Sequence, residues 1–378
     1  MKTIFWLIIA AGLDSAALAQ ALPPPPPVLA PHAAPPERAM LAWIPGEVRC
    51  DGEVVSAAMM RRPLVTLAWP YQNQPTSVGY RFRIDETGRP LSIKLRDSAH
   101  VPQGDDIAPS LAAARFDPGA ARADCEITYA QRRTSLETAP LEDLMSYSLN
   151  RIAGDLPKAG WDRIKPVGTT CLDAPRPQPL TQVFPDFNKV ASTPGVKDWS
   201  MVAYNQDADG SPTNVRIDHG TRNAALDAAA IKAMKASRYS GGARTGCRYP
   251  YWRAPGRMAA PPTPDPETLR PAGSTCPING DWATPPALVY PDAYRRRSIE
   301  GVAIVAFDVA SWGEAGNFRV LASEPSEAFG QQAMTMLRAA KKAPSQMGQV
   351  GCIERISFVM APADTEVPDG PPPAQSVQ

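Results

Sequence analysis

The chain has 378 residues, and 39 Lys and Arg side chains nearly balance 38 Asp and Glu side chains, which gives a formal net charge of +1 at pH 7. Nucleic-acid binding needs a basic excess to neutralise phosphates, so this balance argues against a nucleic-acid partner. The 43 prolines are unevenly spread and concentrate near both ends of the chain. The roughly 325 residues between these ends are too many for one ordinary core and favour two or three small domains.

The N-terminal segment has the features of a secretory signal. A basic residue precedes the apolar run 4–12, and Ala17-Leu18-Ala19 provides the small residues of a cleavage site. Asp14 ends the apolar run well short of the roughly 20 residues that a membrane anchor needs. We predict a signal peptide over residues 1–19 and export of the chain; a retained inner-membrane anchor is the alternative.

Two proline-rich ends flank the rest of the chain. Residues 21–36 read ALPPPPPVLAPHAAPP, which can form neither a helix nor a sheet ladder. We therefore predict an extended tether over residues 20–40 and a disordered tail over residues 363–378.

The cysteines divide the chain between these ends. Taken in consecutive pairs, they are separated by 75, 76 and 76 positions. These near-equal intervals predict disulfides that each close their own unit, and an exported chain would be oxidised. The predicted pairs are Cys50–Cys125, Cys171–Cys247 and Cys276–Cys352. No CxxC spacing and no histidine at ligand spacing occurs, so we expect no metal site.

The amino-acid sequence between the cysteines of each pair shows the same threefold repeat. Each unit has an aromatic-proline pair, then a strand pattern, a turn, a second strand and a helical period of 3.6. A last strand carries the second cysteine. The hairpins are expected over residues 78–95, 199–218 and 301–323, and the closing strands over residues 125–131, 247–253 and 352–360.

These patterns predict the following organisation. Three units span residues 41–133, 166–255 and 273–362; a helical connector (134–165) and a proline-rich spacer (256–272) separate them. Residues 141–152 form an amphipathic helix in the connector, which we expect to pack across the junction of the first two units; a helix that binds a partner is the alternative.

The third unit resembles the C-terminal domain of TonB, the energy-transducing protein of the bacterial periplasm. The matching features are the Tyr290-Pro291 pair, the basic helix Arg295–Arg297, Gly301 before a strand of valines and alanines, the helix opened by Phe329, and the closing strand CIERISFVM. The resemblance is fullest in the third unit, less in the second and least in the first. It implies a periplasmic location and an α+β fold of three tandem units, each a small antiparallel sheet covered by helices.

The chain also departs from that family. TonB proteins keep an N-terminal membrane helix with a serine and a histidine four residues apart, whereas here Ser15 is followed by Ala19. At about 3.1 Å per residue the proline-rich stretch spans only roughly 50 Å, too short to cross a periplasm. We therefore expect a protein that binds an envelope partner without transducing energy. A membrane-anchored, TonB-like energy transducer is the alternative.

The resemblance implies a binding mode, in which the closing strand accepts an extended peptide of an outer-membrane receptor or another envelope protein by strand addition. The third unit is the best candidate, since Pro250 interrupts the closing strand of the second. The candidate partner-binding residues are Tyr290, Pro291, Arg295, Arg296, Arg297, Ile353, Arg355, Ser357 and Val359.

Simpler interpretations of these residues stay open. The closing strands can be ordinary edge strands that serve only the core. The Tyr290-Pro291 pair can pack at a helix start, where Pro is common. Arg295–Arg297 is typical of a solvated face, and anionic lipid or peptidoglycan is its alternative partner.

Nothing in the sequence indicates catalysis. The histidines, His32, His100 and His219, recur in no two units, and no nucleophile elbow, zinc-protease or phosphate-loop motif is present. We therefore expect no enzymatic activity and no cofactor.

Overall fold

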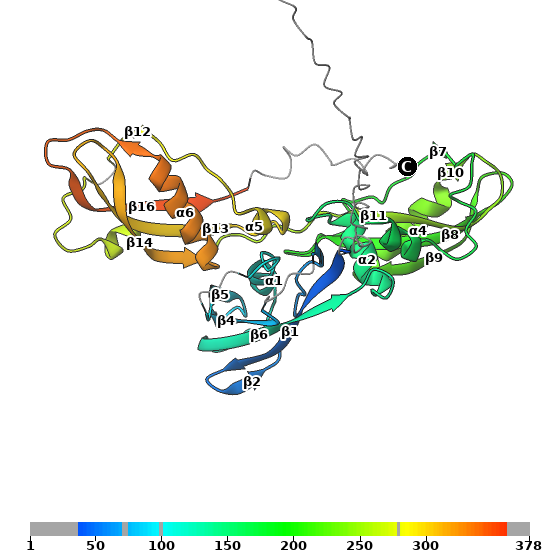
Figure 1. Cartoon of the computed structure of the whole chain (residues 1–378), viewed down its shortest axis with the longest axis horizontal. Helices are drawn as coiled ribbons and strands as arrows, with labels where there is room; N and C mark the ends of the chain where they lie inside the picture. Colours follow the sequence, from blue (N-terminus) through cyan, green and yellow to red (C-terminus); the bar gives the residue numbers. More distant parts are fainter. Residues whose placement is uncertain (1–36, 70–74, 98–100, 278–279, 361–378) are drawn as a thin grey trace, which may run out of the picture. The chain divides into compact units, whose positions relative to one another are not determined.

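The computed structural model describes residues 37–69, 75–97, 101–277 and 280–360 (Figure 1). The predicted signal peptide, almost all of the predicted tether and the tail 363–378 lie outside the described residues. The described part combines a few helices with several small antiparallel sheets, which confirms the α+β class at that level.

The first sheet has the strand order β2-β1-β6-β4-β5, and β3 pairs with β1. Its strands are β1 (Ala39–Cys50), β2 (Glu53–Val55), β3 (Thr66–Ala68), β4 (Ser77–Ile84), β5 (Pro90–Leu95) and β6 (Arg122–Thr134). Helix α1 (Ile107–Ala112) buries Ile107 and Leu111 in one cluster with Phe82 of β4. The hairpin, helix and closing strand follow the predicted order, but strand β1 was not expected and begins within the range given to the tether.

The connector forms helices α2 (Leu141–Leu149) and α3 (Lys158–Ile164). Leu144 and Met145 of α2 are buried in a cluster that also holds Met40 of β1 and Trp199 of the second sheet. Helix α2 therefore packs across the junction of the first two units, as predicted.

The second sheet has the order β11-β8-β9, and helix α4 packs against all three strands. Its elements are β8 (Asp198–Gln206), β9 (Pro212–Gly220), α4 (Ala224–Ala236) and β11 (Arg244–Arg253), with the small pair β7 (Pro179–Thr181) and β10 (Arg238–Tyr239) beside them. The apolar period of α4 explains this packing, because its buried residues are Leu226, Ala230, Ala233 and Met234.

The third sheet has the order β14-β13-β16, and α6 packs against β13 and β14 (Figure 1). Its elements are α5 (Asp292–Arg296), β13 (Gly301–Val309), β14 (Ala315–Glu324), α6 (Glu327–Ala339) and β16 (Gln349–Phe358), with the short pair β12 (Trp282–Thr284) and β15 (Lys341–Lys342). A 3₁₀ turn, η1 (Pro266–Leu269), precedes them.

The closing strands β6, β11 and β16 share one register. Each pairs antiparallel with the first strand of its hairpin, and in each the cysteine lies opposite an aromatic residue. The pairs are Phe82 with Cys125, Tyr204 with Cys247, and Phe307 with Cys352. Because a shift of one residue would turn every side chain to the other face, the shared register places each cysteine on the core side.

The disulfides join Cys50 to Cys125, Cys171 to Cys247 and Cys276 to Cys352, the pairing that the spacing predicts. Each one connects a residue that precedes a hairpin with the closing strand that follows the same hairpin.

A buried ion pair joins the predicted units. Arg297, 4% exposed, donates from Nε to Asp106 Oδ1 at 2.7 Å and from Nη2 to Asp106 Oδ2 at 2.5 Å. The same guanidinium donates to the backbone oxygens of Gly195 at 3.0 Å and Arg62 at 3.1 Å. One side chain of the third unit therefore contacts the first unit and the start of the second.

The outer edge of β5 is also covered by the third unit. Ser92 N donates to Glu324 Oε2 at 2.7 Å, and Ile93 N donates to the oxygen of Pro325 at 3.0 Å. Arg83 pairs with the same Glu324 carboxylate at 2.9 Å. The end of β14 and the start of α6 thus dock on the first sheet.

Within the described part of the chain, no helix is both long and apolar enough to cross a bilayer.

The Arg297 contacts predict a specific sensitivity. Arg297→Ala should lower the free energy of unfolding by about 3–5 kcal/mol, because it leaves the buried Asp106 carboxylate without its counter-charge. Urea unfolding of the full chain measures this loss. The matched control is Arg295→Ala, which removes an exposed guanidinium paired with Asp292 and should cost less than about 0.5 kcal/mol. Equal losses for the two variants would contradict the assignment.

Candidate functional site

Strand β16 forms one edge of the third sheet. Its strand partner is β13, and within the described residues no strand pairs with its other side. Along β16, Cys352, Ile356 and Phe358 are buried, while Arg355 and Ser357 are exposed. An edge strand has backbone N–H and C=O groups that point away from the sheet and can pair with another chain. The predicted residues Arg355 and Ser357 therefore lie exposed on an edge strand, together with the half-buried Ile353, and the 50% exposed Val359 follows directly after it.

Tyr290 lies at the end of this strand. Its ring packs edge-on against Phe329 and Phe358, with centroid distances of 6.3 and 5.8 Å. Its hydroxyl donates to the oxygen of Ile299 at 2.6 Å and also contacts the oxygen of Phe358 at 3.3 Å. Burial, and then the nearby Glu300 carboxylate, raise the pKa of Tyr290. These contacts match the interpretation in which Tyr290 packs, and Pro291 stands at the N-cap of α5, where its missing N–H costs little.

The three predicted arginines separate into two kinds. Arg295 and Arg296 are exposed at the end of α5, and Arg295 pairs with Asp292 at 2.9 Å. Arg297 is buried against Asp106, so its assignment to a solvated, partner-binding face is wrong. The sequence could not reveal this, because the two paired residues are 191 positions apart.

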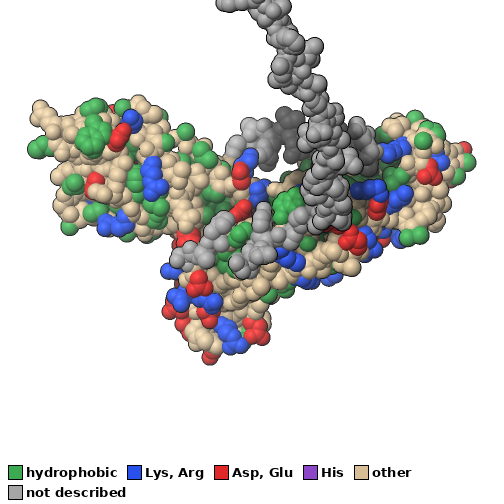
Figure 2. Space-filling model, in the orientation of Figure 1, with side chains coloured by type: hydrophobic (Ala, Val, Ile, Leu, Met, Phe, Trp, Pro, Cys, Tyr) green, Lys and Arg blue, Asp and Glu red, His purple; other side chains and the backbone are tan. Residues whose placement is uncertain are grey.

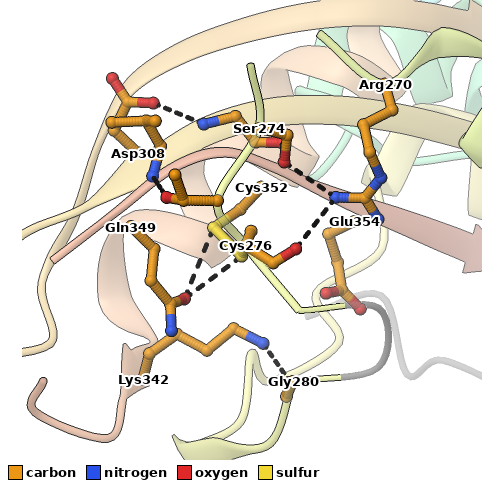
Figure 3. Close-up of a disulfide and its surroundings, with 12 residues drawn as sticks. Arg270, Ser274, Cys276, Gly280, Asp308, Lys342, Gln349, Cys352 and Glu354 are labelled. Atoms are coloured by element: carbon orange, nitrogen blue, oxygen red, sulfur yellow. Dashed lines mark hydrogen bonds between the residues drawn. A yellow bond between two sulfur atoms is a disulfide. The ribbon is translucent and has the colours of Figure 1, made fainter. Parts of the chain in front are cut away.

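A set of hydrogen bonds around the Cys276–Cys352 disulfide holds the other end of β16 (Figure 3). Ser274 Oγ donates to the oxygen of Gly351 at 3.0 Å. Thr275 N donates to the oxygen of Val350 at 3.0 Å, and Val350 N donates back to Thr275 Oγ1 at 3.0 Å. We call residues 274–276 with 350–352 the third-unit clasp.

An aspartate from β13 completes this clasp. Asp308 Oδ1 accepts the N–H of Gly351 at 2.9 Å, and Asp308 Oδ2 accepts the amide of Asn317 at 2.9 Å. The Asn317 amide, and then the Gly351 N–H, hold the pKa of Asp308 below its usual range. Gly351 has φ +67°, a conformation that suits glycine, and a Cβ at this position would lie 3.1 Å from the Cβ of Ser274.

The second unit has the same clasp. Thr169 Oγ1 donates to the oxygen of Gly246 at 2.9 Å, in the place of Ser274 and Gly351. Thr170 N donates to the oxygen of Thr245 at 3.0 Å, and Thr245 N donates back to Thr170 Oγ1 at 2.9 Å. Asn205 Oδ1 accepts the N–H of Gly246 at 3.0 Å, as Asp308 does for Gly351. The repeated pattern TC followed by GC in the sequence could have indicated this detail.

The other closing strands offer less accessible edges. Strand β6 pairs with β4 on one side and with β1 on the other, so its edge is already filled by the chain's own residues 39–50. The closing strand 125–131, which the resemblance matches to a peptide-accepting strand, therefore has no open side in this structure. Strand β11 is an edge, but Pro250 lies within it opposite Met201 and lacks an N–H for another strand.

The described residues hold no group of three or more His, Cys, Asp or Glu side chains placed to bind a metal ion. Charged side chains of both signs alternate over the face shown in Figure 2, without a broad area of one sign. What the β16 edge offers chemically is a row of hydrogen-bonding backbone groups beside the exposed side chains Arg355 and Ser357.

The clasp glycines predict a paired effect on stability. Gly351→Ala and Gly246→Ala should each destabilise the protein by about 2–3 kcal/mol, because each adds left-handed strain to a close contact with Ser274 or Thr169. Gly242→Ala is the control: its φ is +72°, but nothing lies within 4 Å of its added Cβ, so only the strain of about 1 kcal/mol applies. Urea unfolding gives the three losses, and a loss for Gly242→Ala as large as the other two would refute a tight clasp.

Comparison with known proteins assigns a family resemblance to the part of the chain that contains β16. No curated protein matches the chain. Residues 286–360, which contain α5, the third sheet and α6, match the family described as Gram-negative bacterial TonB protein C-terminal. This part of the chain is a TonB C-terminal-like domain.

Proposed function

We propose that this chain is a periplasmic interaction protein whose third unit binds an extended segment of an outer-membrane transport protein, or of another envelope protein, by strand addition to β16. The observation that carries the proposal is the position of β16: it is an edge strand within the part that matches the TonB C-terminal family. Main-chain hydrogen bonds would provide the affinity, and the exposed Arg355 and Ser357 would contribute to the choice of partner.

The disulfides support a location outside the cytoplasm. The structure contains three of them and no free cysteine in its described part, and disulfides persist mainly in oxidising compartments such as the periplasm. Cleavage of residues 1–19 remains a prediction, and a retained anchor would favour the alternative of a TonB-like energy transducer. N-terminal sequencing of the exported protein distinguishes the two.

We also propose that the three sheets are tandem units of one kind. Three observations support this: the common strand order of hairpin and closing strand, the cysteine opposite an aromatic residue in each register, and the clasp that the second and third units share. In this proposal the first two units position the third, through contacts such as that of Arg297 with Asp106, and no unit is catalytic.

Site-specific cross-linking tests the binding edge. A photo-reactive amino acid at Ser357, exposed on β16, should capture an envelope protein in living cells through one extended segment, identified by mass spectrometry of the cross-linked peptide. The matched control is the same amino acid at Arg319, exposed on β14 at the opposite edge of the same sheet. The expected result is a cross-link from position 357 alone.

Two outcomes count against the proposal. Equal capture from both positions would indicate non-specific proximity, and capture only from position 319 would move the binding surface to β14. Co-sedimentation of the unmodified protein with purified sacculi, without any cross-link from position 357, would support peptidoglycan as the partner instead.

A further inference from the structure

The residues before the first cysteine of each pair run beside the closing strand of the same unit. In the first unit these residues are strand β1. It runs antiparallel to β6, from Met40 opposite Thr134 to Cys50 opposite Cys125. The ladder is interrupted only between Pro45 and Val48, where the register shifts. The edge of β6 is therefore filled by a paired strand.

The corresponding segment of the second unit is a helix. Helix α3 ends at Ile164, shortly before Cys171, and the oxygen of Ile164 accepts a hydrogen bond from Arg248 of β11. Arg248 also pairs with Asp218 of β9 at 2.6 Å. A side chain of the closing strand thus fixes the end of α3.

In the third unit this segment comprises residues 259–273, which we call the strap. Before the strap, Met258 N donates to the oxygen of Ser298, and Glu300 N donates to the oxygen of Met258, both at 2.9 Å. After it, the clasp binds residues 274–276 to the start of β16. The 3₁₀ turn η1 in the middle of the strap lies against β16. The strap therefore runs antiparallel to β16, as β1 does to β6.

The strap cannot pair with β16 as β1 pairs with β6. Its prolines have no N–H to donate to a ladder. They are Pro261, Pro262, Pro264, Pro266 and Pro271. Throughout the strap, all of which the structure describes, no hydrogen bond reaches β16. The strap lies beside β16 at η1 without satisfying the backbone groups of that strand.

We propose that the strap is a displaceable cover of the β16 edge, which a partner strand replaces, whereas β1 closes the equivalent edge of the first unit permanently. Both ends of the strap would stay in place during the exchange, because the Met258 contacts and the disulfide-linked clasp hold them. The middle can then leave β16 without breaking any ladder. The identity of the replacing strand rests on the proposed function, but the covering of the edge does not.

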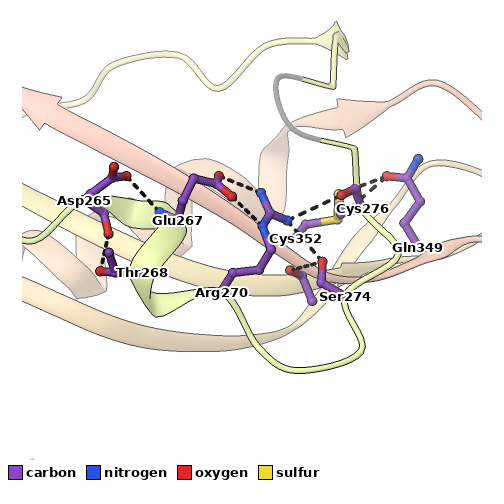
Figure 4. Close-up of polar contacts among 9 residues, drawn as sticks. Asp265, Glu267, Thr268, Arg270, Ser274, Cys276, Gln349 and Cys352 are labelled. Atoms are coloured by element: carbon purple, nitrogen blue, oxygen red, sulfur yellow. Dashed lines mark hydrogen bonds and ion pairs between the residues drawn. A yellow bond between two sulfur atoms is a disulfide. The ribbon is translucent and has the colours of Figure 1, made fainter.

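Arg270 holds the strap in its closed position (Figure 4). Its guanidinium binds both carboxylate oxygens of Glu267 in η1, at 2.7 Å each. It also donates to Ser274 Oγ at 3.1 Å and to the oxygen of Cys276 at 3.4 Å. Arg270 thus connects the turn that lies on β16 to the clasp at the end of the strap.

Hydrogen exchange in the full-length protein, without any partner, tests the cover. Arg270→Ala should accelerate amide exchange within Cys352–Phe358 by about fivefold, the factor that corresponds to loss of one net hydrogen bond. Exchange in β13, whose ladder is intact, should not change. The matched control is Arg295→Ala. This change removes from α5 an ion pair whose two residues, like Arg270 and Glu267, are three positions apart, and it should leave exchange in β16 unchanged.

A second variant acts in the opposite direction. Replacing residues 265–275 by the β1 residues 39–49 places a pairing strand directly before Cys276, as β1 stands before Cys50. This graft should slow exchange within Cys352–Phe358 at least tenfold and abolish the cross-link from position 357. Retention of the Cys276–Cys352 disulfide and of slow exchange in β13 verifies that the grafted unit is folded.

The outcomes separate the two proposals. Unchanged exchange in β16 for Arg270→Ala overturns the strap. Faster exchange in β16 without any cross-link from position 357 supports the strap and contradicts strand addition. Faster exchange together with a stronger cross-link in Arg270→Ala supports both.

Discussion

The disulfide between the residues that precede each hairpin and the closing strand that follows it determines the course of the chain around it. Once Cys50, Cys171 and Cys276 are each bonded to a closing strand, the residues just before them must approach that strand. What they form there depends on local sequence. β1 contains one proline, Pro45, at the point where its register shifts, and can otherwise donate to a ladder. The strap, interrupted by several prolines, can only lie beside β16. The same covalent constraint therefore produces a filled edge in the first unit and an unpaired one in the third.

A second constraint acts between the sheets. In the first sheet, β1 pairs with the side of β6 that faces away from β4. The edge strand β5 is covered by residues 324–327. The Arg297–Asp106 pair lies at the same junction, and burying two charges is tolerated there because backbone oxygens accept two of the three remaining N–H groups of the guanidinium. Docking of β5 against the end of β14 leaves β16, at the opposite side of the third sheet, as the strand available to a partner.

Much of the local structure could be predicted from the sequence, because burial with a period of two or 3.6 is visible in it. The hairpins and helices α4 and α6 are of this kind, and the disulfide pairing follows from the near-equal intervals between the cysteines. Strand β1 could not be recognised, since Pro45-Gly46 breaks its alternation and a proline-rich stretch precedes it. Arg297 was assigned to a solvated face because a run of arginines usually is one; its partner, Asp106, is distant in sequence and belongs to another sheet. The period of two along β16 indicates the side on which Arg355 and Ser357 are exposed, but the strap beside them depends on a tertiary contact that no local pattern encodes.

The family model matches only residues 286–360, and the different surroundings of the three closing strands give a physical reason for this limit. Residues 286–360 retain an edge strand with exposed Arg355 and Ser357, a short helix that precedes the sheet, and Tyr290 packed at the end of β16. In the first unit, β6 lies between two strands, so its side chains must suit β1 on one side and β4 on the other. In the second, Pro250 and the contact of Arg248 with α3 impose other requirements on β11. A common register needs only alternating burial and a cysteine opposite an aromatic residue, whereas resemblance in sequence also needs a common environment along the strand edge. The three sheets share the first, and only the third unit combines it with an edge strand that neither another strand fills nor a proline interrupts.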